Sequence, residues 1–470
     1  MVSDTIVVGH REDPGFGQLC DAVAFRQLVV VTGSGVSAEL GNARSSGAPI
    51  STWHDVLKRL RNEFTDHLRG FDAHLDLLLN ARPQNSEYLI EAATLIRGAV
   101  GFKPYRDAVV SLTTPREGAH SALHDLIEGL EPIGIITFNY DRGHENAYRS
   151  LRRRAPSLQR AIYSDEVKLR TILAGHARSR FLLKAHGCIS RPQSIVLDRD
   201  SYRDIMARQP GYRAFVSHIL ARFDALIVGF GLNDPDFEDF LQTFEANFGG
   251  RIRDHIYIWK RGQREDEEAR AFVLQQRYGL HCIFVNDYEA VRTIIAEAQS
   301  RQGPKLRHII EESLLRSEDV AAYRLQRRAA HQALSELSPT GARVAVTALQ
   351  ACARDEARGP LVRAEAVYSI GKVKPYVPGS AQFLLGEVSP DAEPEVAIHA
   401  LAALLQLDPP VDRPINSWLK TAAELRPLCV GIDDHVSRGS GAFGSPRAVK
   451  YLDALIARWE ATAGVDEAER

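Results

Sequence analysis

Cysteine is scarce in this chain, and its absence in pairs excludes two common ways of stabilising a small domain. The 470 residues include five cysteines, and no two of them lie close together. This dispersal argues against a disulfide framework, and without a CxxC pair we expect no structural zinc. A reducing compartment, the cytoplasm, is therefore the expected location.

Long apolar runs are also missing, and the net charge is small. No run approaches the roughly 20 apolar residues of a membrane helix. The first residues show no basic start followed by an apolar stretch, so we expect no membrane span and no secretory signal. The 58 basic and 60 acidic side chains give a formal charge of −2, which makes direct nucleic-acid binding an unexpected role. Hydrophobic residues make up 44%, as in an ordinary globular protein.

Short apolar runs, separated by helix-patterned stretches, predict a doubly wound parallel sheet, the Rossmann-like α/β fold. A short helix is expected at 21–27. The segment from about 50 to 130 is mostly helical and too long for a simple crossover, so we interpret it as a helical insertion beside the sheet. The expected strands are 28–31, 133–137, 181–185, 225–229, 255–259 and 281–285.

A change in composition after about residue 301 predicts a second domain. Gln302-Gly303-Pro304 marks the boundary, so we assign residues 1–300 to the α/β domain and 305–470 to an all-α domain. In the latter, the pattern from Pro360 to Val373 recurs from Pro394 to Leu407. This recurrence predicts a short HEAT-like helical repeat; the alternative is an irregular helical bundle.

A glycine-rich motif follows the first expected strand. Gly33, Ser34, Gly35 and Ser37 lie where the carboxyl ends of parallel strands line a ligand crevice. Glycines there allow close approach of the backbone to an anion such as pyrophosphate. A purely structural strand-to-helix turn is the alternative.

Polar residues follow the next strands in the same way. Asn139 can hydrogen-bond a ribose hydroxyl or a water, and Asp141 can bind the ribose or form an Asx turn that caps the next helix. His186 has the side chain whose ordinary pKa lies nearest neutrality, which suits a general base. Gly229 and Gly231 are expected to face a ligand, whereas for the Asn233-Asp234 pair that follows the alternative is the capping of a helix.

Together these motifs resemble the sirtuin-like NAD-binding domain. They are Gly-Ser-Gly-Val-Ser, Thr-Phe-Asn-Tyr-Asp, Lys-Ala-His-Gly and Val-Gly-Phe-Gly-Leu-Asn-Asp-Pro, in that order within about residues 20–290. The resemblance implies that Gly33, Ser34, Gly35 and Ser37 line the dinucleotide pocket. It also implies that Asn139 and Asp141 hold the nicotinamide ribose and that His186 is the catalytic base.

Two departures from the deacetylase sirtuins redirect the expected activity. The chain lacks their paired cysteines for zinc, and it reads Pro49-Ile-Ser-Thr-Trp53 where they carry an acidic-aromatic-arginine run. The Pro-x-x-x-Trp variant is similar to the bacterial defence-associated branch of the family. That likeness implies an NAD hydrolase that depletes NAD during phage infection, with a C-terminal domain that assembles a homo-oligomer or binds a partner protein or phage-derived activator.

Two other functions stay open. The first is a sirtuin-type protein deacylase or an ADP-ribosyltransferase, which would use the same residues. The second is a catalytically idle nucleotide-binding module that assembles a complex through its helical domain. Intact Asn139 and His186 argue against the idle module.

Overall fold

The chain forms two compact units, one comprising residues 1–22 and 27–298 and the other residues 23–26 and 299–470. Within them, the computed structural model describes residues 13–40, 52–81, 86–151, 158–174, 180–230, 241, 253–262, 266–315, 324–389, 391–407, 415–438 and 447–468. None of the helices in these ranges is long and apolar enough to cross a membrane.

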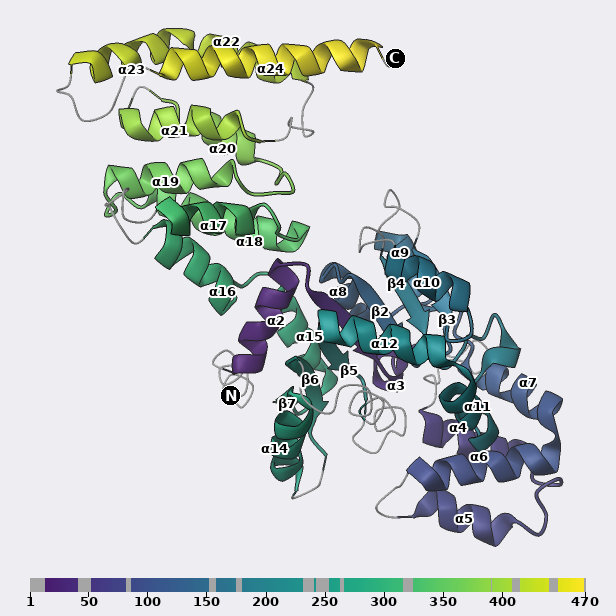
Figure 1. Cartoon of the computed structure of the whole chain (residues 1–470). Helices are drawn as coiled ribbons and strands as arrows, with labels where there is room; N and C mark the ends of the chain where they lie inside the picture. The colour runs from purple at the N-terminus through teal and green to yellow at the C-terminus, as the bar shows by residue number, and fades with distance from the viewer. Residues whose placement is uncertain are drawn as a thin grey trace. The chain divides into compact units, whose positions relative to one another are not determined.

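A seven-stranded sheet organises the first unit, in the order β3-β4-β2-β1-β5-β6-β7 (Figure 1). All neighbouring strands are parallel. The central strand β1 pairs with β2 on one side and β5 on the other, so the winding reverses at β1. The strands are β1 (Leu28–Thr32), β2 (Gly134–Thr137), β3 (Gln159–Ile162), β4 (Phe181–Lys184), β5 (Asp224–Val228), β6 (His255–Lys260) and β7 (Leu280–Val285). The predicted doubly wound α/β fold is confirmed.

Strand β3 was not predicted from the sequence. It lies at one edge of the sheet and pairs only with β4. Of its four residues, Ala161 and Ile162 are buried, whereas Gln159 is half-buried and Arg160 exposed. An edge strand with a polar first half lacks the apolar run by which the other strands are recognised.

Each face of the sheet carries its own layer of helices. Val31, Leu183 and Ile227 point to the face that packs against α10 and α12. Thr32 points to the other face, because its Oγ1 lies 3.0 Å from Nε2 of His144 on α9. The helices of this unit, apart from the insertion, are α2 (Pro14–Ala24), α3 (Ser34–Ser37), α8 (Ala122–Gly129), α9 (Gly143–Leu151), α10 (Glu166–Ala174), α11 (Arg199–Arg208), α12 (Pro210–Arg222), α14 (Glu267–Tyr278) and α15 (Tyr288–Ala298). The first described helix begins at Pro14 and ends at Ala24, so the helix expected at 21–27 is present over 21–24 but begins and ends earlier than predicted.

The helical insertion has a hydrophobic core of its own. Its helices are α4 (Trp53–Glu63), α5 (Asp72–Asn80), α6 (Ser86–Val100) and α7 (Phe102–Thr113). Leu57, Leu75 and Ile96 are fully buried where these helices meet. Arg97 of α6 forms an ion pair with Asp198 at 2.5 Å, which links the insertion to the segment that follows β4.

Only helices occur among the described residues of the second unit. They are α16 (Pro304–Arg307), a π-helical segment (His308–Leu314), α17 (Arg324–Leu334), α18 (Pro339–Arg354), α19 (Pro360–Ile370), α20 (Ser380–Gly386), α21 (Pro394–Leu404), α22 (Ile415–Glu424), α23 (Arg426–Arg438) and α24 (Ala448–Ala468). The two recurring patterns form α19 and α21, which have the same length and lie side by side (Figure 1). Val367 and Leu401, at matching positions, are both fully buried. The all-α character is confirmed, and the HEAT-like assignment stays a prediction.

Candidate functional site

Backbone loops meet at the carboxyl edge of the sheet, because strands β1, β2, β4 and β5 end at the same level. Hydrogen bonds continue the pairing beyond the strands. They run from the Gly33 amide to the Val228 carbonyl (3.0 Å), from the Phe138 amide to the Thr32 carbonyl (3.0 Å) and from the Ala185 amide to the Thr137 carbonyl (2.8 Å). The glycine loop, Asn139 and His186 therefore emerge at one edge, where the winding reverses and where open α/β sheets bind ligands.

Asn139 is fixed in place by residues of the glycine loop. Its Nδ2 donates to the Gly33 carbonyl at 2.8 Å and to Ser37 Oγ at 2.9 Å. Both Nδ2 hydrogens are thus used within the protein, while no described residue donates a hydrogen bond to Oδ1. The amide therefore presents an oriented acceptor, which suits a hydroxyl group or a water.

Gly33 and Gly35 allow the loop after β1 to pack directly on the loop after β5. The Gly35 amide donates to the Gly229 carbonyl at 2.8 Å. A Cβ at Gly33 would lie 2.7 Å from the Gly229 oxygen, and a Cβ at Gly35 would lie 2.1 Å from the hydroxyl of Tyr288. Gly229 has φ +80°, a conformation that favours glycine. The sequence predicts close approach to a ligand; the close approach in the structure is between two loops, with Ser34 half-buried beside them.

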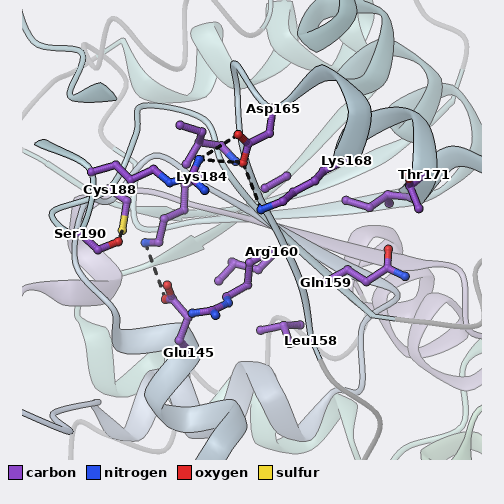
Figure 2. A pocket seen from close by; sticks show the side chains of 15 residues that line it. Glu145, Leu158, Gln159, Arg160, Asp165, Lys168, Thr171, Lys184, Cys188 and Ser190 are labelled. Carbon is purple, nitrogen blue, oxygen red and sulfur yellow. Dashed lines mark hydrogen bonds and ion pairs between the residues drawn. The ribbon is translucent and has the colours of Figure 1, made fainter. Parts of the chain in front are cut away.

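Asp141 and Lys184 hold the backbone that follows β2. Asp141 Oδ1 accepts a hydrogen bond from the Gly143 amide at 2.7 Å, so the Asx turn is formed, and a ribose contact stays a prediction. The buried Lys184 donates to the carbonyl of Asn139 at 3.2 Å and to that of Asp141. Glu145 Oε2 on α9 lies 3.7 Å from the Lys184 Nζ (Figure 2). The ammonium therefore anchors the segment that carries Asn139.

His186 lies on the next loop, packed between aromatic rings. The centroid of its ring is 4.9 Å from that of Phe138 and 5.2 Å from that of Tyr202, with edge-on geometry in both cases. Its carbonyl accepts a hydrogen bond from the Val196 amide at 3.1 Å. Burial lowers the pKa of His186 to about 3, so the imidazole is neutral at pH 7. Opening of the crevice to water would return the pKa toward about 6.5.

Gly187 fixes the turn that presents His186. Its φ is +86°, and a Cβ would lie 2.0 Å from the backbone oxygen of Ser194. We expect Gly187→Ala to lower the free energy of unfolding by at least about 1–3 kcal/mol, because the residue is strained and the backbone cannot move aside. Gly98→Ala on α6 is the matched control, since nothing lies within 4 Å of its Cβ. Urea unfolding of both variants checks this; equal stabilities would contradict it.

Three buried histidines predict loss of stability in acid. Burial lowers the pKa of His186 to about 3 and those of His124 and His255 to about 4. The unfolded chain binds protons near pH 6.5 and the folded chain does not, so stability is complete above about pH 6.5 and falls as the pH drops toward 4. Each histidine should lower the free energy of unfolding by up to about 2 kcal/mol at pH 5. Urea unfolding at pH 7.5 and 5.0 measures the difference, and His255→Gln should reduce it; a pH-independent stability would refute the expectation.

The structure brings most of the predicted site residues to one edge of the sheet. Gly33, Ser37 and Asn139 contact one another directly, and Phe138 joins this group to His186. Gly231, Asn233 and Asp234, by contrast, lie outside the described residues.

Lys184 and Glu145 were missed as partners. A lysine that ends an apolar strand was the available signal, because buried lysines are almost always paired. The position of the partner on α9 could not be read from the sequence. Among the described residues, no group of three or more His, Cys, Asp or Glu side chains is arranged to hold a metal ion.

This geometry defines a doubly wound α/β protein with polar side chains gathered at the switch point of its sheet. Residues 134–283 match the family model of the SIR2-like domain. That range contains β2 to β6, most of β7, Asn139, Asp141 and His186, and the glycine loop precedes it. The match supports a sirtuin-like domain with NAD-related activity. The chain matches no curated protein.

Proposed function

We propose that the chain is an NAD glycohydrolase, which cleaves the bond between nicotinamide and ribose. The observation that carries the proposal is the Asn139 amide, held by Gly33 and Ser37 at the edge of the sheet where His186 also emerges. The match to the SIR2-like domain supports NAD as the substrate. No cofactor beyond this substrate is required.

In the proposed reaction, nicotinamide leaves as a neutral molecule and the ribose becomes cationic in character. The nicotinamide ring of NAD already carries a positive charge, so no acid is needed to protonate the leaving group. Asn139 Oδ1 accepts a hydrogen bond from a ribose hydroxyl or from the attacking water. His186 takes a proton from that water as its oxygen bonds to the ribose carbon, which gives ADP-ribose.

The remaining site residues would position the dinucleotide. Gly33, Ser34, Gly35 and Ser37 form the loop that lies nearest Asn139, and we assign them to the dinucleotide pocket. Asp141 would hold the nicotinamide ribose. Gly229 and Gly231 would line the same pocket from the loop after β5. These assignments rest on the shared edge of the sheet and on the likeness to the sirtuin-like domain.

Product analysis tests this proposal. Purified protein is incubated with NAD, and nicotinamide, ADP-ribose and cyclic ADP-ribose are quantified by mass spectrometry. We expect nicotinamide and ADP-ribose in equal amounts, without any added peptide. Nicotinamide release that requires an acceptor protein would instead indicate ADP-ribosyl transfer, and intact NAD would favour the idle nucleotide-binding module.

Protein deacylation is the second candidate, because the same residues could serve it. An acetyl-lysine peptide in the same incubation separates the two activities: a deacylase would release nicotinamide only with the peptide. Elemental analysis adds an independent check. We expect no zinc, since the five cysteines are dispersed along the sequence and form no CxxC pair, and one tightly bound zinc per chain would favour the deacylase.

We further propose that residues 305–470 control the activity by self-association or by binding a partner protein. An unrestrained NAD hydrolase would harm its own cell, and stacked helices offer extended surfaces for protein contacts. Analytical ultracentrifugation of the full chain, with NAD turnover measured at the same concentrations, tests the self-association. Turnover per chain that rises with association is expected; a fully active monomer would contradict it.

The biological role that we propose is NAD depletion in antiphage defence, leading to abortive infection. It rests on the likeness of the Pro49–Trp53 segment to the defence-associated branch. Bacteria that express the chain should lose NAD and survive as a population when challenged with a sensitive phage, whereas cells with His186→Ala should not be protected. Equal protection by both forms would exclude NAD cleavage as the mechanism.

A further inference from the structure

A cavity of about 540 Å³ lies over β3 and β4 (Figure 2). Neither Asn139 nor His186 lines it. Its volume falls within the roughly 300–1,000 Å³ of small-molecule sites. The proposed NAD cleavage assigns no role to this space.

The cavity lies at the β3 edge of the sheet, where it is lined by Glu145 of α9 and, from the other face, by Lys168, Thr171 and Ile172 of α10. Arg160 pairs in register with Leu182, and Ile162 with Lys184. Because side chains alternate along a strand, these four residues share one face. Lys184 contacts Glu145 of α9, which identifies it as the face that carries α9. The cavity therefore lies beside Lys184, whereas the candidate active site lies beyond the ends of the strands.

The deep end of the cavity offers a hydrogen-bond acceptor. Glu145 is 6% exposed, and its Oε2 accepts no hydrogen bond from the described residues, since Lys184 Nζ is 3.7 Å away. Lys184 Nζ donates hydrogen bonds to two backbone carbonyls and pairs with this carboxylate by charge alone. A molecule that reaches this depth gains by supplying a donor, such as a hydroxyl or an amino group, because a buried carboxylate oxygen that accepts no hydrogen bond is costly even within an ion pair.

The outer part of the cavity is basic. Arg160, Lys168 and Arg191 line it and are exposed, and Asp165 is the acidic group among them. Arg191 donates to both oxygens of Asp165, at 2.8 and 3.1 Å. Burial alone would raise the pKa of Asp165, but the hydrogen bonds from Arg191 and the Ile162 amide lower it. Lys168 also pairs with Asp165, at 3.6 Å, so three cations surround a single carboxylate, and the excess of positive charge favours an anion.

We propose that this cavity binds a sugar monophosphate, either free or as part of a mononucleotide. A sugar hydroxyl donates to Glu145 at the deep end. The phosphate lies between Arg160 and Lys168 at the outer end, where charge-assisted hydrogen bonds are strong. The deep end of the cavity favours a hydrogen-bond donor and the outer end favours an anion. A sugar monophosphate carries both groups, a hydroxyl and a phosphate.

Calorimetric titration of the full chain tests the proposal with four compounds: ribose 5-phosphate, AMP, ribose and inorganic phosphate. We expect ribose 5-phosphate, AMP or both to bind, at least about tenfold more tightly than ribose or phosphate alone. Binding of ribose 5-phosphate identifies the free sugar phosphate as sufficient, and binding of AMP alone identifies the mononucleotide.

Variants locate the binding site. Lys168→Ala and Arg160→Ala should each weaken binding by about tenfold. Arg170→Ala is the matched control, because Arg170 lies on the same helix α10, pairs with Glu166 and does not line the cavity. Glu145→Gln should weaken compounds with a sugar but not phosphate alone; its melting temperature is recorded to confirm folding.

Two results would overturn the proposal. One is the absence of saturable binding by all four compounds. The other is binding that Lys168→Ala and Arg160→Ala leave unchanged, which would place the compound elsewhere, for example in the crevice at Asn139. Neither readout uses NAD cleavage, so failure of the proposed hydrolase and failure of this site are distinguishable.

Discussion

Replacing His186 should reduce NAD cleavage by about 10²–10⁴-fold, the usual contribution of a general base. His186→Gln is the preferred variant, because it retains a polar side chain of similar size between Phe138 and Tyr202, whereas His186→Ala also leaves a cavity. Mass spectrometry of nicotinamide release measures the effect, and circular dichroism confirms the fold.

His255→Gln is the matched control for this experiment. His255 is also buried, and its pKa is likewise lowered by burial, to about 4. It begins β6, however, at the opposite end of the strands from the crevice. We expect His255→Gln to retain NAD cleavage. Near-normal turnover by a folded His186→Gln protein would remove the proposed mechanism.

Asn139→Ala should also abolish cleavage, for a different reason. The substitution removes the Oδ1 acceptor and the hydrogen bonds that Nδ2 donates to the Gly33 carbonyl and to Ser37 Oγ, although the Gly33 carbonyl still accepts from the Val36 amide. We therefore expect a lower turnover number together with a modest loss of stability. Normal cleavage by this variant would show that the amide does not touch the reacting ribose or water.

Lys184→Met should lower the free energy of unfolding by about 3–5 kcal/mol, the cost of breaking a buried ion pair from one side. The substitution leaves Glu145 charged and buried, and it removes the donor to the carbonyls of Asn139 and Asp141. The double variant Lys184→Met/Glu145→Leu should recover part of the loss, because no uncompensated charge remains. Urea unfolding of the single and double variants measures both effects.

An exposed pair controls for the general effect of removing a lysine. Lys103 and Asp107 form an ion pair on the surface of α7, with 80% and 51% of their side chains exposed. Such pairs contribute little to stability, so Lys103→Met should leave the unfolding midpoint unchanged. If Lys184→Met behaved in the same way, the buried pair would not anchor the Asn139 segment.

The core strands could be predicted from the sequence because they are buried on both faces. Leu28-Val-Val-Val31 and the runs that begin at Ile133 and Phe181 are continuous apolar stretches, which a strand covered by helices on both sides requires. β3 could not be predicted, because its first half faces solvent at the edge of the sheet. Local composition therefore reveals central strands and conceals edge strands.

The candidate site was predictable only as a set of positions. The order of the strands brings the glycine loop, Asn139 and His186 to one edge, and each of these residues follows an apolar run. The contacts depend on residues far apart in the sequence. The backbone of Gly229, 2.9 Å from a Cβ at Gly35, explains why Gly35 tolerates no side chain, and Glu145 explains why Lys184 can be buried. Such pairings follow from helix orientation, which one sequence does not specify.

The central position of β1 has a consequence for how the protein is made. Val29 pairs with Gly134, and Leu28 pairs with Asp224, so the first strand to be synthesised gains its second neighbour only after most of the unit has left the ribosome. Pairing between such distant segments is slow, and an exposed apolar strand is prone to aggregation while it waits. The edge at which the glycine loop meets Gly229 is therefore assembled late in translation, and a nascent chain that stops before β5 has neither a complete sheet nor a crevice.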